Sequence, residues 1–157
     1  MDENELKRII GLFSENVFRT AYCYLKSYAD ADDIQSEAFI KLYTCGKVFE
    51  SDEHIKAWLL RVTANLCKNK LKSNRYRNCI PLKACAGKDE VNDDFSEYLF
   101  GLKPKNRIAL YMHYYEGYSV KEIASLTGEK ESTILSRLSR GRKQLKEILV
   151  KEGYNES

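Results

Sequence analysis

The sequence predicts an all-α protein: two small helical domains joined by a flexible linker, the C-terminal one a helix-turn-helix. Apolar residues recur at steps of three and four along most of the chain, which is the spacing of one helix face. No stretch keeps a period-two alternation for long, so no sheet is expected. Residues 77–94 show no sustained periodicity and are interpreted as the linker between domains at 1–76 and 95–157.

The composition excludes several classes of protein. The chain has 157 residues, 43% of them hydrophobic and 31% charged, which suits one domain or two small ones. No apolar run is longer than that of residues 21–25, which is far shorter than the roughly 20 residues of a membrane helix, and the acidic start is unlike a signal peptide. We therefore expect a cytoplasmic protein without membrane insertion.

Catalysis and metal binding are not expected either. The five cysteines include no C-x-x-C pair, so neither a disulfide framework nor a zinc site is indicated. No glycine-rich phosphate loop and no nucleophile–base pattern is present. The sequence predicts a non-enzymatic protein with no cofactor and no metal.

Three helices are predicted in the first half. The first carries on one side Leu6, Ile9, Ile10, Phe13, Val17, Ala21, Leu25 and Tyr28. The second is expected to begin at Asp30 as its N-cap and to bury Ile34, Ala38, Phe39 and Leu42. After a break at 45–47, Ser51 opens a third helix whose expected apolar stripe is Ile55, Trp58, Leu59, Val62 and Leu66.

Three further helices are predicted in the second half. One begins at Pro104, a residue favoured in a first helical turn, and ends near Tyr115, before Gly117. Ser119 and Glu122 form a capping box that opens a short helix ending near residues 127–128. A last helix is expected from about 131 to 151.

Charge is concentrated in two basic zones although the net charge is only +3. No Asp or Glu occurs between residues 54 and 88, where the basic residues are Lys56, Arg61, Lys68, Lys70, Lys72, Arg75, Arg77, Lys83 and Lys88. An acidic segment at 89–97 follows. The second zone comprises Lys130, Arg137, Arg140, Arg142, Lys143 and Lys146. Two such zones indicate two contacts with a polyanion; a pair of solvated helix faces is the alternative.

The last two predicted helices have the outline of a DNA-binding helix-turn-helix, with small Ala124 at the packing contact and Gly128 in the turn. Ile134, Leu138, Gly141, Leu145 and Ile148 fall on one side of the last helix, which leaves Ser132 among the outward residues. The candidates for reading base edges are Leu135, Ser136, Ser139 and Arg140. The candidates for phosphate contacts are Lys130, Arg137, Arg142 and Lys143. A plain helical hairpin with a basic face is the alternative, and Gly141 is expected only to loosen the helix.

Several segments together resemble the extracytoplasmic-function (ECF) sigma factors of RNA polymerase. In the second half these are LKPKNRI at 102–108, YSVKEIA at 118–124 and STILSRLSRGRKQL at 132–145. In the first half, DADDIQSEAFIKLY at 30–43 is similar to the family's polymerase-binding helix. AWLLRVTANL at 57–66 is similar to the segment that engages the promoter element nearest the start site. The family usually has Gln where this chain has Ser36, and here Gln35 lies one position earlier.

The resemblance implies two further sets of contacts. Those with the clamp helices of core polymerase are Asp33, Ser36, Glu37 and Ile40, which helical spacing places on one face. Those with the proximal promoter element are Arg61, Asn65, Lys68, Asn69 and Lys72, a stripe expected opposite a core containing Trp58. The preceding loop, about 47–53, would hold an unstacked base of the non-template strand. Phe49 is either a stacking surface there or a plug of the core.

By this resemblance the chain is expected to bind core RNA polymerase and promoter DNA and to help separate the strands, and an anti-sigma factor is a candidate partner. One alternative is a sigma-like helix-turn-helix regulator that does not bind polymerase. Another is a helical adaptor whose basic faces bind an acidic protein.

Overall fold

A computed structural model describes residues 1–73 and 98–153 of the chain, and six helices with no strand occupy these ranges. The helices are α1 (Glu3–Leu25), α2 (Tyr28–Thr44), α3 (Asp52–Lys72), α6 (Pro104–Tyr114), α7 (Val120–Thr127) and α8 (Glu131–Lys151). The prediction of an all-α fold is confirmed. The chain divides into two compact units, Met1–Ala86 and Gly87–Ser157. The predicted linker at 77–94 lies outside the described residues.

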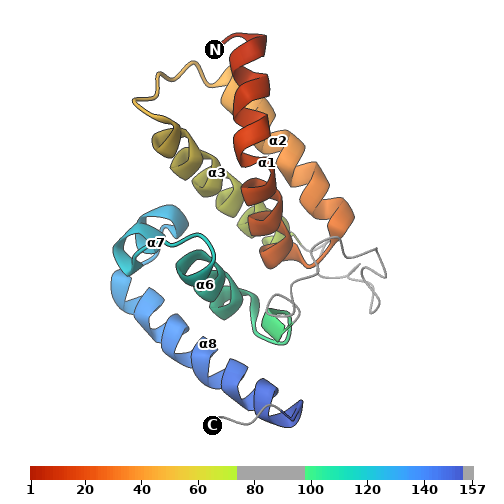
Figure 1. Cartoon of the computed structure of the whole chain (residues 1–157), viewed down its shortest axis with the longest axis vertical. Helices are drawn as coiled ribbons and strands as arrows, with labels where there is room; N and C mark the ends of the chain where they lie inside the picture. Colours follow the sequence, from red (N-terminus) through yellow and green to blue (C-terminus); the bar gives the residue numbers. More distant parts are fainter. Residues whose placement is uncertain (74–97, 154–157) are drawn as a thin grey trace. The chain divides into compact units, whose positions relative to one another are not determined.

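The first unit is a bundle in which α1, α2 and α3 each contact the other two (Figure 1). Its core is apolar and drawn from all three helices, with Ile9, Val17, Ala21, Ala31, Ala38, Leu42, Leu59 and Leu60 almost fully buried. At the surface, the Lys70 ammonium lies 3.3 Å from an Asp30 carboxylate oxygen and links α3 to α2. The first unit therefore has one compact core, and the outer sides of its helices remain available.

The connection between α1 and α2 is tighter than predicted. Lys26 ends α1 in a left-handed conformation with φ 55°, and Ser27 caps α2 by accepting a hydrogen bond from the Asp30 N–H at 3.3 Å. The expectation that Asp30 is the N-cap is therefore wrong: it lies in the first turn of α2. Tyr28, expected on the first helix, is the first residue of α2. The chain reverses over only two residues, so both helix ends are fixed by neighbouring groups.

Ser51 caps α3 as predicted, accepting from the His54 N–H at 3.1 Å. The buried side of α3 is not the predicted stripe, however, because Trp58, Val62 and Leu66 are only half-buried. The side facing α1 and α2 carries Ile55, Leu59, Leu60, Thr63, Ala64 and Cys67. Thr63 is tolerated in this core because its hydroxyl donates to the Leu59 carbonyl at 2.7 Å. The prediction is correct for Ile55 and Leu59, but it missed Leu60 and the less apolar Thr63, Ala64 and Cys67.

The second unit packs α6 and α7 against α8 (Figure 1). Both hydrogen bonds of the predicted capping box are present, since the Glu122 N–H donates to Ser119 Oγ at 3.2 Å and the Ser119 N–H donates to Glu122 Oε1 at 3.0 Å. Gly128 ends α7 in the left-handed conformation, with φ 72°. Ile123, Ile134 and Leu138 are buried between the helices. The predicted helix-turn-helix is confirmed.

Gly141 has a packing role that the sequence did not indicate. It is buried at the contact between α8 and α6, and a Cβ at this position would lie 3.0 Å from Leu110 Cδ1 and 3.1 Å from Leu110 Cγ. The two helices therefore approach closely because residue 141 has no side chain. The earlier expectation that Gly141 only loosens the helix is incomplete.

A pair of glycine substitutions tests this contact. Gly11 lies inside α1 with open space around the position of a Cβ, so Gly11→Ala should raise stability by about 1 kcal/mol, the difference in helix propensity. Gly141→Ala should give little of this gain, because the new methyl group crowds Leu110. Residue-resolved amide hydrogen exchange would measure the stability of each unit. Equal stabilisation at both positions would show that Leu110 does not depend on a glycine there.

Candidate nucleic-acid and protein interfaces

The outer side of α8 is exposed and basic. Ser132, Leu135, Ser136, Ser139, Arg140 and Lys143 are all exposed, whereas Ile134, Leu138, Gly141 and Leu145 on the opposite side are buried. Lys130 is also exposed and precedes the first residue of the helix. Leu135 has an exposed fraction of 55%. This side can therefore meet a polyanion with cations, hydroxyl groups and one apolar side chain.

Two of the predicted phosphate contacts already have partners within the unit. Arg137 Nη1 lies 3.2 Å from Glu129 Oε1, and the Arg137 side chain is only 13% exposed. Arg142 Nη1 lies 3.4 Å from the Tyr114 hydroxyl oxygen, although Arg142 itself is exposed. A phosphate contact by Arg137 would require its ion pair to open. Both assignments stay predictions.

A second polar stripe runs along α3. Arg61, Asn65, Asn69 and Lys72 are exposed and Lys68 is half-buried, so these five side chains border solvent on one flank of the helix. Trp58 lies beside this stripe rather than in a core opposite it, because it is half-buried. Amides alternating with cations suit contacts to base edges and phosphates together.

The loop at 45–51 is ordered by the start of α3. The Phe49 ring packs edge-on against Trp58 and His54, with ring centroids 5.7 and 5.3 Å apart. The Lys47 ammonium lies 5.9 Å from the centroid of the Trp58 ring. Of the two roles considered for Phe49, the structure favours the plug, since its ring is engaged within the unit. Val48 is 94% exposed and projects from the loop.

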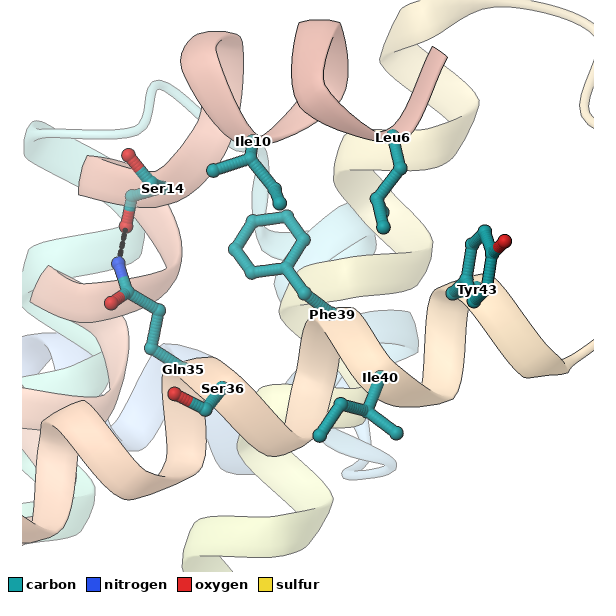
Figure 2. Close-up of a pocket in the computed structure, with 8 residues that line it drawn as sticks. All are labelled: Leu6, Ile10, Ser14, Gln35, Ser36, Phe39, Ile40 and Tyr43. Carbon is teal, nitrogen blue, oxygen red and sulfur yellow. Dashed lines mark hydrogen bonds between the residues drawn. The ribbon is translucent and has the colours of Figure 1, made fainter. Parts of the chain in front are cut away.

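The exposed side of α2 adjoins an apolar groove. Asp33, Ser36, Glu37 and Ile40 are all exposed on this helix, and the exposed fraction of Ile40 is 62%. Figure 2 shows the groove between α1 and α2, lined by Leu6, Ile10, Ser14, Gln35, Ser36, Phe39, Ile40 and Tyr43. A mostly apolar groove suits a protein side chain better than it suits a nucleic acid.

Gln35 fixes the wall of this groove. Its amide Nε2 donates a hydrogen bond of 2.7 Å to the Ser14 backbone carbonyl, as Figure 2 shows, and so ties α2 to α1. The following residue, Ser36, is left exposed at the groove. The shift of Gln by one position therefore gives the amide a structural role. Sequence reasoning missed both this bond and the α1 side of the groove, because they depend on how two helices pack.

The pKa values of several ionisable groups in the described residues are shifted. Hydrogen bonds from the Arg8 guanidinium hold the pKa values of Glu5 and Asp52 below their usual range. Burial raises the pKa of the Cys67 thiol, which therefore stays protonated. Among residues 1–73 and 98–153, no group of three His, Cys, Asp or Glu side chains could hold a metal ion. No helix in these ranges is long and apolar enough to cross a membrane.

Family comparisons match each unit separately. The model of sigma-70 region 2 matches residues 10–77, and the model of sigma-70 region 4 matches residues 93–145. The first match contains the loop at 45–51, the α3 stripe and all of the groove lining except Leu6. The second contains α7 and α8 as far as Leu145. Together the two matches cover most of the chain, with region 2 before region 4.

Individual relatives agree with these matches. The chain is 28% identical to the ECF RNA polymerase sigma factor SigE of Mycolicibacterium smegmatis over 91% of its own length, and it spans 61% of that protein. It is 27% identical to the RNA polymerase sigma factor SigV of Bacillus subtilis and spans 87% of it, over 88% of the chain.

Solved structures show the same fold. The sigma factor RpoE from Bartonella quintana, in complex with the anti-sigma factor NepR, has a TM-score of 0.72 at 22% identity, over 93% of this chain and 97% of that one. CnrH in complex with the cytosolic domain of CnrY has a TM-score of 0.67 at 17% identity, over 97% and 92% of the two chains. The chain belongs to the ECF sigma factors of RNA polymerase, with sigma-70 region 2 in its first unit and region 4 in its second.

Proposed function

We propose that the chain directs transcription initiation by docking on core RNA polymerase through α2 and contacting promoter DNA through α3 and α8. The observation that carries this proposal is the coincidence of the two sigma-70 regions with three exposed faces, one apolar and acidic and two basic. Sigma factors have no reaction of their own, so the chain acts as a non-enzymatic initiation factor. Its proposed role is to bind core polymerase and promoter DNA and to help separate the DNA strands.

Polymerase docking is assigned to the α2 face. Asp33 and Glu37 lie one helical turn apart and Ile40 follows on the same side, next to the groove. A partner helix that places an aliphatic side chain in the groove and cations beside the two carboxylates would match this surface. The clamp helices of polymerase, implied by the family resemblance, are that partner.

Promoter binding is assigned to the two basic faces. On α8 we assign base reading to Leu135, Ser136, Ser139 and Arg140, because the early residues of a recognition helix enter the major groove. Phosphate contacts by Lys130 and Lys143 hold this helix in register. On α3 the stripe from Arg61 to Lys72 contacts the proximal element, and the exposed tip of the loop at 45–51 meets the separated strand.

Place of action and regulation complete the proposal. A protein that acts on polymerase and promoter DNA works in the cytoplasm. RpoE of Bartonella quintana forms a complex with an anti-sigma factor, and this supports an anti-sigma partner for the present chain. Such a partner would act by covering one of the exposed faces described above.

The role of α8 predicts a selective defect for Arg140→Ala. Transcription with core polymerase from a promoter recovered from a random DNA library should fall about tenfold, since a base contact is worth roughly 1–3 kcal/mol. Retention of core polymerase on the tagged chain should not change, because Arg140 lies in the other unit from α2. Lys151→Ala, an exposed basic residue at the end of α8, is the matched control. Loss of core retention in Arg140→Ala would refute the assignment.

The role of α2 predicts that Ile40→Ala weakens the binding of core polymerase and leaves DNA binding intact. Removing this exposed aliphatic group should weaken the retention of core polymerase about tenfold, the effect of losing an apolar anchor. Binding of the isolated chain to duplex DNA should be unaffected. Val150→Ala removes a similarly exposed aliphatic group from α8 and serves as the control. If the wild-type chain retains no core polymerase at moderate salt, the sigma function is excluded and a polymerase-independent regulator is favoured.

A further inference from the structure

The loop at 45–51 is mostly exposed, and its position depends on a few anchors. At the α2 end, Gly46 turns the chain with φ 67°. In the middle, the Phe49 ring rests against Trp58 and His54, while Val48 projects into solvent. At the α3 end, Ser51 caps the helix. An additional anchor comes from α1, which is far from the loop in sequence.

Arg8 of α1 binds the first residue of α3 in a bidentate manner. Its Nη1 and Nη2 donate to the two carboxylate oxygens of Asp52, each at 2.9 Å. Its Nε and Nη2 also donate to the two carboxylate oxygens of Glu5, at 3.1 and 2.7 Å. Glu5 lies one turn before Arg8 and holds the guanidinium in place, so little side-chain freedom is lost when Asp52 binds.

This ion pair contributes little to the stability of the fold. The side chains of Arg8 and Asp52 are each 46% exposed, and ion pairs in that setting are screened by water and salt. The role of the pair is to fix the position of the loop. Asp52 directly follows the N-cap Ser51, so the bond between Arg8 and the Asp52 carboxylate holds the end of the loop against α1. A bidentate guanidinium–carboxylate contact defines both distance and orientation.

The Arg8–Asp52 pair is also separate from the apolar groove between α1 and α2. Leu6 and Ile10 line the groove, and Arg8 lies two residues from each of them, on the other side of α1. A change at Arg8 can therefore move the loop without altering the groove wall. We propose that Arg8 is a positioning residue that acts through Asp52 to hold the loop at 45–51 for contact with the separated promoter strand, an inference that rests on the proposed function.

The test compares Arg8→Ala, Asp52→Asn and the double variant. Each is assayed with core polymerase on a promoter recovered from a random library and on a copy with altered bases in its proximal element. Lys7→Ala and Glu53→Gln are the matched controls, because these exposed charged residues neighbour Arg8 and Asp52 and Glu53 shares the first turn of α3. Core retention and circular dichroism are measured in parallel.

We expect each single variant to lower discrimination between the two promoters about tenfold, the range of one lost base contact. The double variant should be no worse than either single variant, since both remove the same contact. Core retention should stay within about twofold of the wild type, as expected for residues outside that interface. Discrimination equal to that of the controls, additive losses, or a parallel loss of core retention would overturn the inference. If the wild-type chain shows no discrimination, the proposed function has failed instead.

Discussion

Each unit of this protein contains few helices, and each long helix must bury one side to form a core. This constraint decides which side chains are available for binding. In α8, burial of Ile134, Leu138 and Leu145 forces Arg140 and Lys143 to the outside. In α2, burial of Ala38 and Leu42 leaves Glu37 and Ile40 exposed. The binding faces are thus a consequence of the packing that stabilises each unit.

The faces differ in the physics of binding that they support. The α2 groove offers apolar surface, whose burial is largely independent of salt, and Asp33 and Glu37 are exposed on the same helix. The faces of α3 and α8 offer cations and hydrogen-bonding groups, so the DNA contacts proposed for them should weaken as salt rises. A division of this kind lets one chain hold polymerase firmly while it samples promoters through weak contacts. The Arg8–Asp52 pair adds geometric control where strand separation is assigned.

Local signals in the sequence predicted several helix ends, although not the start of α2, which is capped by Ser27 and not by Asp30. Ser51, the Ser119–Glu122 capping box and Gly128 act through hydrogen bonds or backbone conformations within a few residues, so spacing alone identifies them. Contacts between helices were harder to predict. The close approach at Gly141 depends on Leu110, which is distant in the sequence, and the burial of Thr63 depends on how α3 packs against α1 and α2. The pairing of Arg137 with Glu129 depends on the geometry of the turn between α7 and α8. The binding faces of α2 and α8 follow from periodicity, whereas the groove and the Arg8 pair follow only from packing.

The central claim is that two separate units place basic faces on promoter DNA at two places when the chain is carried by polymerase. Hydroxyl-radical footprinting of a selected promoter, bound by the chain and core polymerase together, tests this directly. The account predicts two separated protected segments. Replacing basic residues of α8 by uncharged ones should weaken protection of the upstream segment, and the same change on α3 should weaken protection of the downstream segment. A single protected segment, or two segments that respond together to either set of substitutions, would contradict it.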